Sequence, residues 1–159
     1  MKIILTLLLS CGICSINVGH CDGYIMDFKY YKGYVFDKSK EVTFINGVSN
    51  RFTPSKQEIE HIEKIISVSI PKEKKATTNL GKQCPKISKN LKNYNRQYIG
   101  YMDINGNRIV WINFIWKKNC PSNWEKDIIL NMDGCSYFWQ TKINLEDDKI
   151  FDLFINGMA

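Results

Sequence analysis

The stretch that decides the fold is Ile-Val-Trp-Ile-Asn-Phe-Ile-Trp, residues 109–116, which follows closely on Asn105-Gly106. Both alternating faces of this stretch are apolar, which predicts a central β-strand that is covered on both sides. Asn-Gly supplies the positive φ angles that a tight hairpin turn requires. We therefore expect residues 94–102 to form an antiparallel strand beside it.

The chain after this hairpin has the pattern of further antiparallel strands. Residues 117–126 are expected to form a loop, and residues 128–132 a short strand. Residues 135–145 alternate between apolar and polar side chains, which predicts a half-buried strand. An acidic turn at residues 146–149 then leads into a last strand, residues 150–155.

One helix is expected before these strands. Thr53 followed by Pro54 predicts one N-terminus, and the Ser55-x-x-Glu58 capping box predicts another two residues later. Pro71 is expected to end the helix. An apolar stripe at helical spacing lies between these signals, formed by Ile59, Ile62, Ile65, Ile66 and Ser69.

Two extended segments are expected before the helix, residues 24–36 and residues 41–45. A single amphipathic helix must bury its apolar stripe, and the only large apolar partner in this chain is the sheet. The sequence therefore predicts an α+β fold, with one helix on an antiparallel sheet of four or five strands. Residues 20–159 are expected to make a single domain of ordinary size.

The start of the chain has the pattern of a secretory signal peptide. Lys2 is followed by an apolar run at residues 3–9 and then by small residues up to Gly19. We expect cleavage near Gly19 and export, so that the protein is secreted, periplasmic or at the cell surface. The alternative is lipidation of Cys11, because residues 8–11, Leu-Leu-Ser-Cys, resemble a bacterial lipobox. No transmembrane span is expected, since the apolar run is far shorter than the roughly 18 residues that a span needs.

Four cysteines remain after cleavage near Gly19, and an even number in an exported chain predicts two disulfides. Cys120 and Cys135 bracket one loop, so we expect them to pair, which leaves Cys21 to pair with Cys84. A zinc site is not expected, because no Cys-x-x-Cys pair remains and the chain has only two histidines. We expect no metal and no cofactor.

The formal net charge of +6 is concentrated in residues 71–92. This segment holds a single acid, Glu73, against Lys72, Lys74, Lys75, Lys82, Lys86, Lys89 and Lys92. We interpret it as a solvated, mobile loop, and attraction to an anionic surface or partner is the alternative. Nucleic acid is not an expected partner, because these lysines are not interleaved with aromatic residues and the segment has no arginine.

The predicted order of strand, helix and antiparallel meander resembles the cystatin-like α+β fold, in which a curved sheet wraps one helix. That superfamily includes protease inhibitors, small-molecule binders and enzymes, so the resemblance implies no single function. Four pieces of the chain also resemble a group of uncharacterised exported bacterial proteins, namely residues 93–98, 111–113, 133–138 and 151–159. That second resemblance implies export and brings no activity with it.

Aromatic side chains are the remaining candidates for a binding site. We expect most of them in the core and some on the face of the sheet that the helix leaves uncovered. The candidates are Trp111, Trp116, Trp124, Tyr98 and Tyr101.

The resemblance to cystatins also offers a test for protease inhibition. Residues 97–100, Gln-Tyr-Ile-Gly, approach the Gln-x-Val-x-Gly motif of cystatins, but their glycine comes one position early. Pro121 and Trp124 have the residue types of the second cystatin loop but are separated by two residues. An inhibitor of this kind would need an exposed wedge of hairpins near Asn105 and Trp124.

A catalytic constellation is not found in the sequence. His61 lies on the predicted helix between Glu60 and Glu63, and we expect it to be exposed and paired with a glutamate. No nucleophile elbow and no phosphate-binding glycine loop is present. The sequence therefore predicts a small exported, non-enzymatic binding or interaction module for a protein or small molecule. Two alternatives are an inhibitor of a secreted protease and an enzyme with a sheet-lined pocket.

Overall fold

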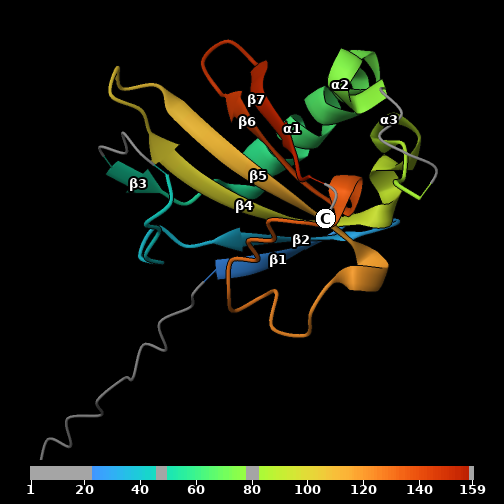
Figure 1. Ribbon diagram of the computed structural model, residues 1–159. Helices are drawn as coiled ribbons and strands as arrows, with labels where there is room; N and C mark the ends of the chain where they lie inside the picture. The colour runs from blue at the N-terminus through green and yellow to red at the C-terminus, as the bar shows by residue number, and fades with distance from the viewer. Residues whose placement is uncertain (1–22, 46–49, 78–82, 158–159) are drawn as a thin grey trace, which may run out of the picture.

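A seven-stranded sheet organises the chain, with helix α1 (Lys56–Ser69) packed on one face and two long loops on the other (Figure 1). The computed structural model describes residues 23–45, 50–77 and 83–157. The expected signal peptide, Cys11 and Cys21 lie outside these residues. No helix in the described ranges has the length and apolar character to cross a membrane.

The remaining elements are short. The strands are β1 (Gly23–Asp27), β2 (Lys32–Phe36), β3 (Asn50–Phe52), β4 (Tyr94–Met102), β5 (Arg108–Trp116), β6 (Phe138–Asn144) and β7 (Lys149–Ile155). The other helical segments are α2 (Lys74–Thr77), α3 (Ile87–Asn90) and the 3₁₀ turns η1 (Ile70–Lys72), η2 (Leu91–Asn93), η3 (Lys117–Asn119) and η4 (Cys135–Tyr137).

The strand order is β1-β2-β4-β5-β6-β7, and β3 pairs with β4 on the same side as β2. Every pair is antiparallel except β2 with β4, which run parallel with Gly33 opposite Arg96. The predicted α+β class is confirmed, but the sheet has more strands than the four or five expected. The aromatic segment before the helix accounts for two of them, because it folds into the β1–β2 hairpin through a turn closed by Phe28 N–H and Tyr31 O at 3.0 Å.

The β4–β5 hairpin forms where the sequence predicts it. Gly106 has a φ of +82°, and the Asp103 carboxylate accepts hydrogen bonds of 2.8 Å from the N–H groups of Asn105 and Asn107. Hydrogen bonds from the Asn107 side chain and these backbone groups hold the pKa of Asp103 below its usual value. The turn is therefore fixed by its own polar side chain.

Helix α1 begins at the second of the two predicted N-termini. Ser55 is the N-cap, and its side chain and that of Glu58 form a reciprocal capping box. The helix passes into η1 at Ile70, where Pro71 interrupts it. The apolar stripe packs on the sheet against strand residues of the first core cluster, among them Tyr98, Val110, Ile112, Phe114, Trp139 and Ile143.

A row of buried amide side chains holds the long loop between η3 and η4 on the other face. Gln97 on β4 donates to the carbonyls of Trp124 and Asp127, at 2.6 and 2.7 Å. Asn113, its neighbour on β5, donates to the Ile129 carbonyl at 2.6 Å. The strand predicted over residues 128–132 is therefore wrong, because amide side chains rather than a neighbouring strand bind its backbone.

Two further sequence predictions are corrected. Residues 41–45 form no strand and instead cover the second core cluster with Val42, Phe44 and Ile45. The lysine-rich residues 71–92 are not one continuous loop, since their described part contains α2, α3 and two 3₁₀ turns.

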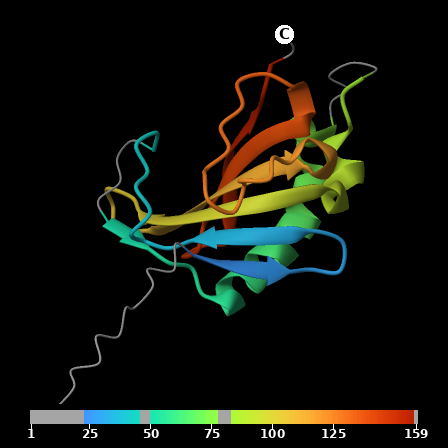
Figure 2. The same cartoon turned by 90° about the horizontal axis from the view of Figure 1, so that it is seen from below.

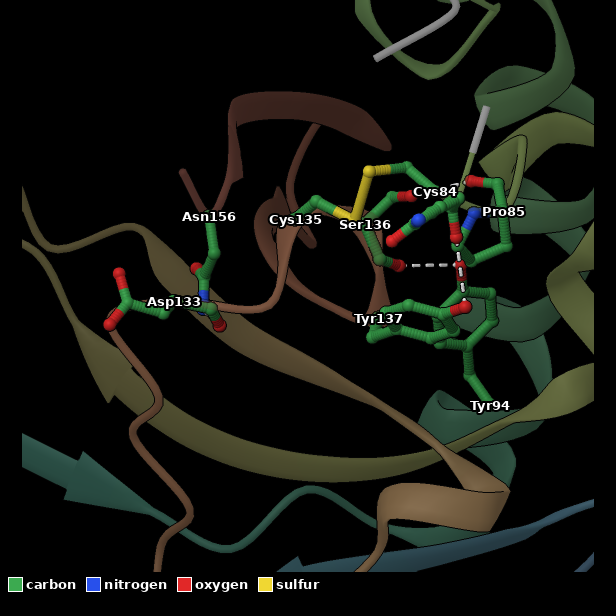
Figure 3. Close-up of a disulfide and its surroundings, with 9 residues drawn as sticks. Cys84, Pro85, Tyr94, Asp133, Cys135, Ser136, Tyr137 and Asn156 are labelled. Carbon is green, nitrogen blue, oxygen red and sulfur yellow. Dashed lines mark hydrogen bonds between the residues drawn. A yellow bond between two sulfur atoms is a disulfide. The ribbon is translucent and has the colours of Figure 1, made fainter. Parts of the chain in front are cut away.

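The disulfide joins Cys84 to Cys135, so both expected pairings, Cys120 with Cys135 and Cys21 with Cys84, are wrong (Figure 3). The neighbours of both cysteines are also joined: the Ser136 hydroxyl donates to the Pro85 carbonyl at 2.5 Å. Cys120 forms no disulfide within the described residues and packs against the second core cluster, where burial raises its pKa. The loop that separates Cys120 from Cys135 therefore does not bring them together.

His61 is exposed, as expected, but its partner is different. Its Nε2 lies 2.8 Å from Oδ1 of Asp148, which is in the turn between β6 and β7. The expected partner was a glutamate of its own helix. The contact ties the helix to the far end of the sheet, and it is half-exposed on both sides.

Candidate functional site

The five aromatic residues proposed as binding candidates lie mostly in the interior. Tyr98 is completely buried, and Tyr101, Trp111 and Trp124 are each less than a tenth exposed. Trp116 is the one of the five with a partly exposed side chain. Side chains this deeply buried contribute mainly to packing, although Trp111 also lines a pocket beside β7, and Trp116 is the candidate with the most accessible side chain.

The wedge that a cystatin-like inhibitor needs does not form at Trp124. That side chain is 7% exposed, and its carbonyl oxygen accepts a hydrogen bond from the fully buried Gln97. The residues nearest to the two cystatin motifs are therefore joined to each other inside the protein. They are not available to enter a protease cleft.

A buried ion pair that sequence reasoning missed lies between helix α1 and strand β4. Arg96 Nε is 2.9 Å from Oε1 of Glu63, and the two side chains are 2% and 9% exposed. The Nε–H bond does not point along this line, so the contact is an ion pair more than a linear hydrogen bond. Two tyrosine hydroxyls also donate hydrogen bonds to the Glu63 carboxylate. Tyr98 donates to Oε1 at 2.7 Å, and Tyr31 donates to Oε2 at 2.6 Å.

The guanidinium of Arg96 has further partners that connect three segments. It donates to the carbonyl oxygens of Tyr94 and Leu91, at 2.8 and 3.1 Å. Its central carbon lies 3.5 Å from the centre of the Tyr31 ring, which is close stacking of a cation on an aromatic face. Arg96 thus fixes the β1–β2 turn and η2 against the start of β4.

Gly33 allows this close packing. A Cβ atom at position 33 would lie 2.6 Å from the ring of Tyr98, which is shorter than any tolerable contact. A larger residue at position 33 would push β2 away from the buried Tyr98 ring of β4, so the pairing of these two strands requires glycine here.

We predict that this network delays the ionisation of its tyrosines. Burial, and then the Glu63 carboxylate, raise the pKa of Tyr98 well above 10, and burial is also the main cause of the raised pKa of Tyr31. The neutral phenols therefore stabilise the fold below about pH 10, and this stability is lost as the pH rises above the pKa of an unfolded tyrosine.

Alkaline titration followed by phenolate absorbance checks this prediction. The folded protein should show phenolate absorbance for Tyr98 only when it unfolds, and Tyr98→Phe should remove that part of the signal. The protein in urea, where all tyrosines should titrate near pH 10, is the control. Ionisation of Tyr98 in the folded protein near pH 10 would contradict the buried network.

The ion pair supports a surface that we call the basic–aromatic end. It lies where the β1–β2 turn, the start of β4 and the end of β5 meet, on the right of Figure 1 and of Figure 2. Its residues are Lys29, Tyr30, Tyr31, Lys32, Lys92, Asn93, Asn95, Trp116, Lys117 and Lys118.

Three lysines from three separate segments surround Tyr30, which is 54% exposed. Lys29 of the hairpin turn and Lys92 of η2 place their ammonium groups 5.1 and 5.7 Å from the centre of its ring. Lys117 of η3 donates to the Tyr30 carbonyl at 2.9 Å. The end of the lysine-rich segment therefore meets aromatic residues, although the sequence keeps them far apart.

Few acidic side chains of the protein neutralise the lysines at this end. Lys32 forms an ion pair with Asp27 at 3.7 Å, and both side chains are more than half exposed. Within the described residues, Lys29, Lys92, Lys117 and Lys118 form no ion pair with an acid. The exposed ammonium groups thus attract anions from solution.

Two pockets of similar size open side by side at the basic–aromatic end and share Lys117. The first, of about 360 Å³, is lined by Asp27, Phe28, Tyr30, Tyr31, Lys32, Asn95 and Lys117. The second, of about 330 Å³, is lined by Asn93, Trp116, Lys117 and Lys118. Both volumes are at the lower end of the range of small-molecule sites.

A third pocket of about 360 Å³ lies beside the edge strand β7. Its charged groups are largely satisfied, since Lys142 and Asp152 form an ion pair of 2.9 Å and Lys75 donates to the Leu153 carbonyl at 3.3 Å. Lys75 also blocks part of the free edge of β7, which protects it from pairing with another strand. This pocket therefore offers less uncompensated charge to a ligand than the basic–aromatic end.

Comparison of the chain with models of protein families, with curated proteins and with solved structures finds no match.

Proposed function

We propose that the protein is a small exported, non-enzymatic binding module that holds an anionic partner at its basic–aromatic end. The observation that carries the proposal is the cluster of Lys29, Lys92 and Lys117 around the exposed Tyr30. These lysines come from three segments, so the cluster depends on the fold and not on a local run of charge.

Export is supported by two features of the chain. The first residues have the pattern of a signal peptide, and the described part contains the Cys84–Cys135 disulfide. Structural disulfides are common in exported proteins and rare in the cytosol. A lipid tether at Cys11 would keep the same module at a membrane surface.

A binding role rather than catalysis is supported by how Glu63 is used. Both of its carboxylate oxygens are occupied, one by Arg96 and Tyr98 and the other by Tyr31. A carboxylate with these partners and 9% exposure is placed for structure, because it has no free oxygen to take a proton from a substrate.

Two charge-matched triple variants test the proposal. One is Lys92→Glu with Lys117→Glu and Lys118→Glu, at the basic–aromatic end. The control, Lys38→Glu with Lys64→Glu and Lys149→Glu, changes three exposed lysines elsewhere and alters the net charge equally. Binding is measured to dextran sulfate, to poly-glutamate, and to vesicles of phosphatidylcholine and phosphatidylserine at about four to one.

We expect the wild-type protein to bind at least one of these probes in a salt-sensitive manner. The variant at the basic–aromatic end should lose more than about tenfold in affinity, because each lysine near an anionic surface contributes about 1 kcal/mol. The control should lose much less. Equal losses in both variants, or no binding to any probe, would overturn the proposal.

A further inference from the structure

We infer that the anionic partner is a linear acidic oligosaccharide, whose successive sugar rings occupy the two adjacent pockets while carboxylate or sulfate groups contact the lysines. This inference rests on the proposed function and adds the class of ligand. It starts from three kinds of side chain that both pockets contain.

Each pocket combines an aromatic ring, an amide side chain and lysines. In the first these are Tyr30, Asn95 and Lys117, and in the second Trp116, Asn93 and Lys117 with Lys118. The first pocket also contains Lys32 and the Asp27 carboxylate, which form an ion pair with each other. An aromatic face accepts the apolar side of a sugar ring, an amide exchanges hydrogen bonds with its hydroxyl groups, and a lysine pairs with its acid. A polymer with a repeating charged unit places one unit in each pocket and makes the same kinds of contact in both.

The ring of Trp116 is held in place to serve such a pocket. Tyr94 and Tyr137 meet it edge to face, with centroid distances of 5.1 and 5.5 Å. Tyr94 is itself fixed, because its hydroxyl donates to the Ser136 carbonyl at 2.7 Å beside the disulfide (Figure 3). A ring with a fixed position loses little conformational freedom when a ligand stacks on it.

Other anionic partners fit this end less well. The only arginine here is Arg96, which is buried and bound to Glu63 and to backbone carbonyls, so the forked guanidinium contacts typical of phosphate recognition are absent from the described part of this surface. A lipid surface would favour apolar side chains for insertion. The most exposed apolar side chains, Ile104 and Met132, lie on other loops.

Isothermal titration calorimetry of the mature protein tests the inference. The probes are tetragalacturonate, a heparin-derived tetrasaccharide, neutral maltotetraose and the single-stranded DNA octathymidylate. The variants are Trp116→Ala and Trp116→Phe, with Phe154→Ala as the control because Phe154 is exposed on β7, two strands away from β5, and lines neither pocket. Circular dichroism establishes that each variant is folded.

We expect at least one acidic tetrasaccharide to bind and the neutral one to bind about tenfold more weakly or not at all. Trp116→Ala should weaken binding by about tenfold, which corresponds to the loss of one aromatic contact, whereas Trp116→Phe and Phe154→Ala should change it little. These results would support the inference.

The opposite results separate the inference from the proposed function. If poly-glutamate or the phosphatidylserine vesicles bind at this end and neither acidic tetrasaccharide does, the inference is overturned and the proposed function stands. Tighter binding of octathymidylate than of either tetrasaccharide overturns it as well. If no anionic probe binds, the inference and the proposed function fail together.

Discussion

Replacement of Arg96 by methionine will lower the free energy of unfolding by about 3–5 kcal/mol, the largest loss we expect from a single substitution. The change leaves the Glu63 carboxylate buried without its cation and removes the hydrogen bonds that Arg96 donates to the carbonyls of Leu91 and Tyr94. It also removes the support of the Tyr31 ring. Urea unfolding followed by circular dichroism measures the loss.

The double variant Glu63→Met with Arg96→Met separates the pair from its surroundings. A buried ion pair replaced by apolar residues of similar volume often costs little, so the double variant should be more stable than Arg96→Met alone. Glu60→Gln, an exposed change on the same helix, should leave stability within about 0.5 kcal/mol. A loss below about 1 kcal/mol in Arg96→Met would mean that the ion pair does not hold this end of the sheet together.

Removal of the disulfide through Cys84→Ser with Cys135→Ser is expected to cost about 4 kcal/mol. The bridge closes a loop in which the cysteines are 51 positions apart, and in the chain-entropy model a loop of this length contributes about that much. Its loss also removes the covalent link between η4 and the segment before α3. The hydrogen bonds from Ser136 and Tyr137 to the Pro85 and Gln83 carbonyls remain.

Cys120→Ser is the matched control for this prediction. Cys120 is free and partly buried, so its replacement should cost less than about 1 kcal/mol. Mass spectrometry of peptides from a non-reducing digest shows which cysteines are paired. A larger loss in Cys120→Ser than in the double variant would contradict the pairing of Cys84 with Cys135.

The strongly patterned parts of the chain are those that the sequence predicts correctly. The apolar run at residues 109–116 forms β5, residues 94–102 form β4 beside it with the expected turn at Asn105-Gly106, and the capping box at Ser55 starts the helix. In each case local residues and burial favour the same structure. The likeness to the cystatin-like fold stays a prediction.

Other parts depend on contacts that no local pattern reveals. The backbone of Ile129 is bound by Gln97 and Asn113, which lie far from it in the sequence, so residues 128–132 are drawn into a loop in spite of their strand-like pattern. The partner of Cys135 is likewise decided by which segments meet at η4. In both cases the tertiary contacts outweigh the local structural propensity of the segment.

The candidate site was harder to predict than the fold. Tyr30, Lys92 and Lys117 are separated by tens of residues in the sequence. The pairing of β4 with β5 brings Lys92 near Lys117, and the pairing of β2 with β4 brings the β1–β2 turn with Tyr30 to the same end. One signal was present in the sequence, a single arginine at position 96 within an otherwise uncharged strand. A charge in such a place needs a buried partner, and Glu63 on the apolar side of the helix supplies it.

The most direct test of the central claim is to map where an anionic ligand binds. A chain of residues 20–159, labelled with ¹⁵N, is titrated in separate experiments with tetragalacturonate and with hexaglutamate, and amide chemical shifts are recorded by NMR. We predict that the shifts gather at residues 29–32, 92–95 and 116–118 and at the Trp116 indole. Shifts confined to β7 and residues 128–133, or spread over all exposed lysines, would contradict a binding site at the basic–aromatic end.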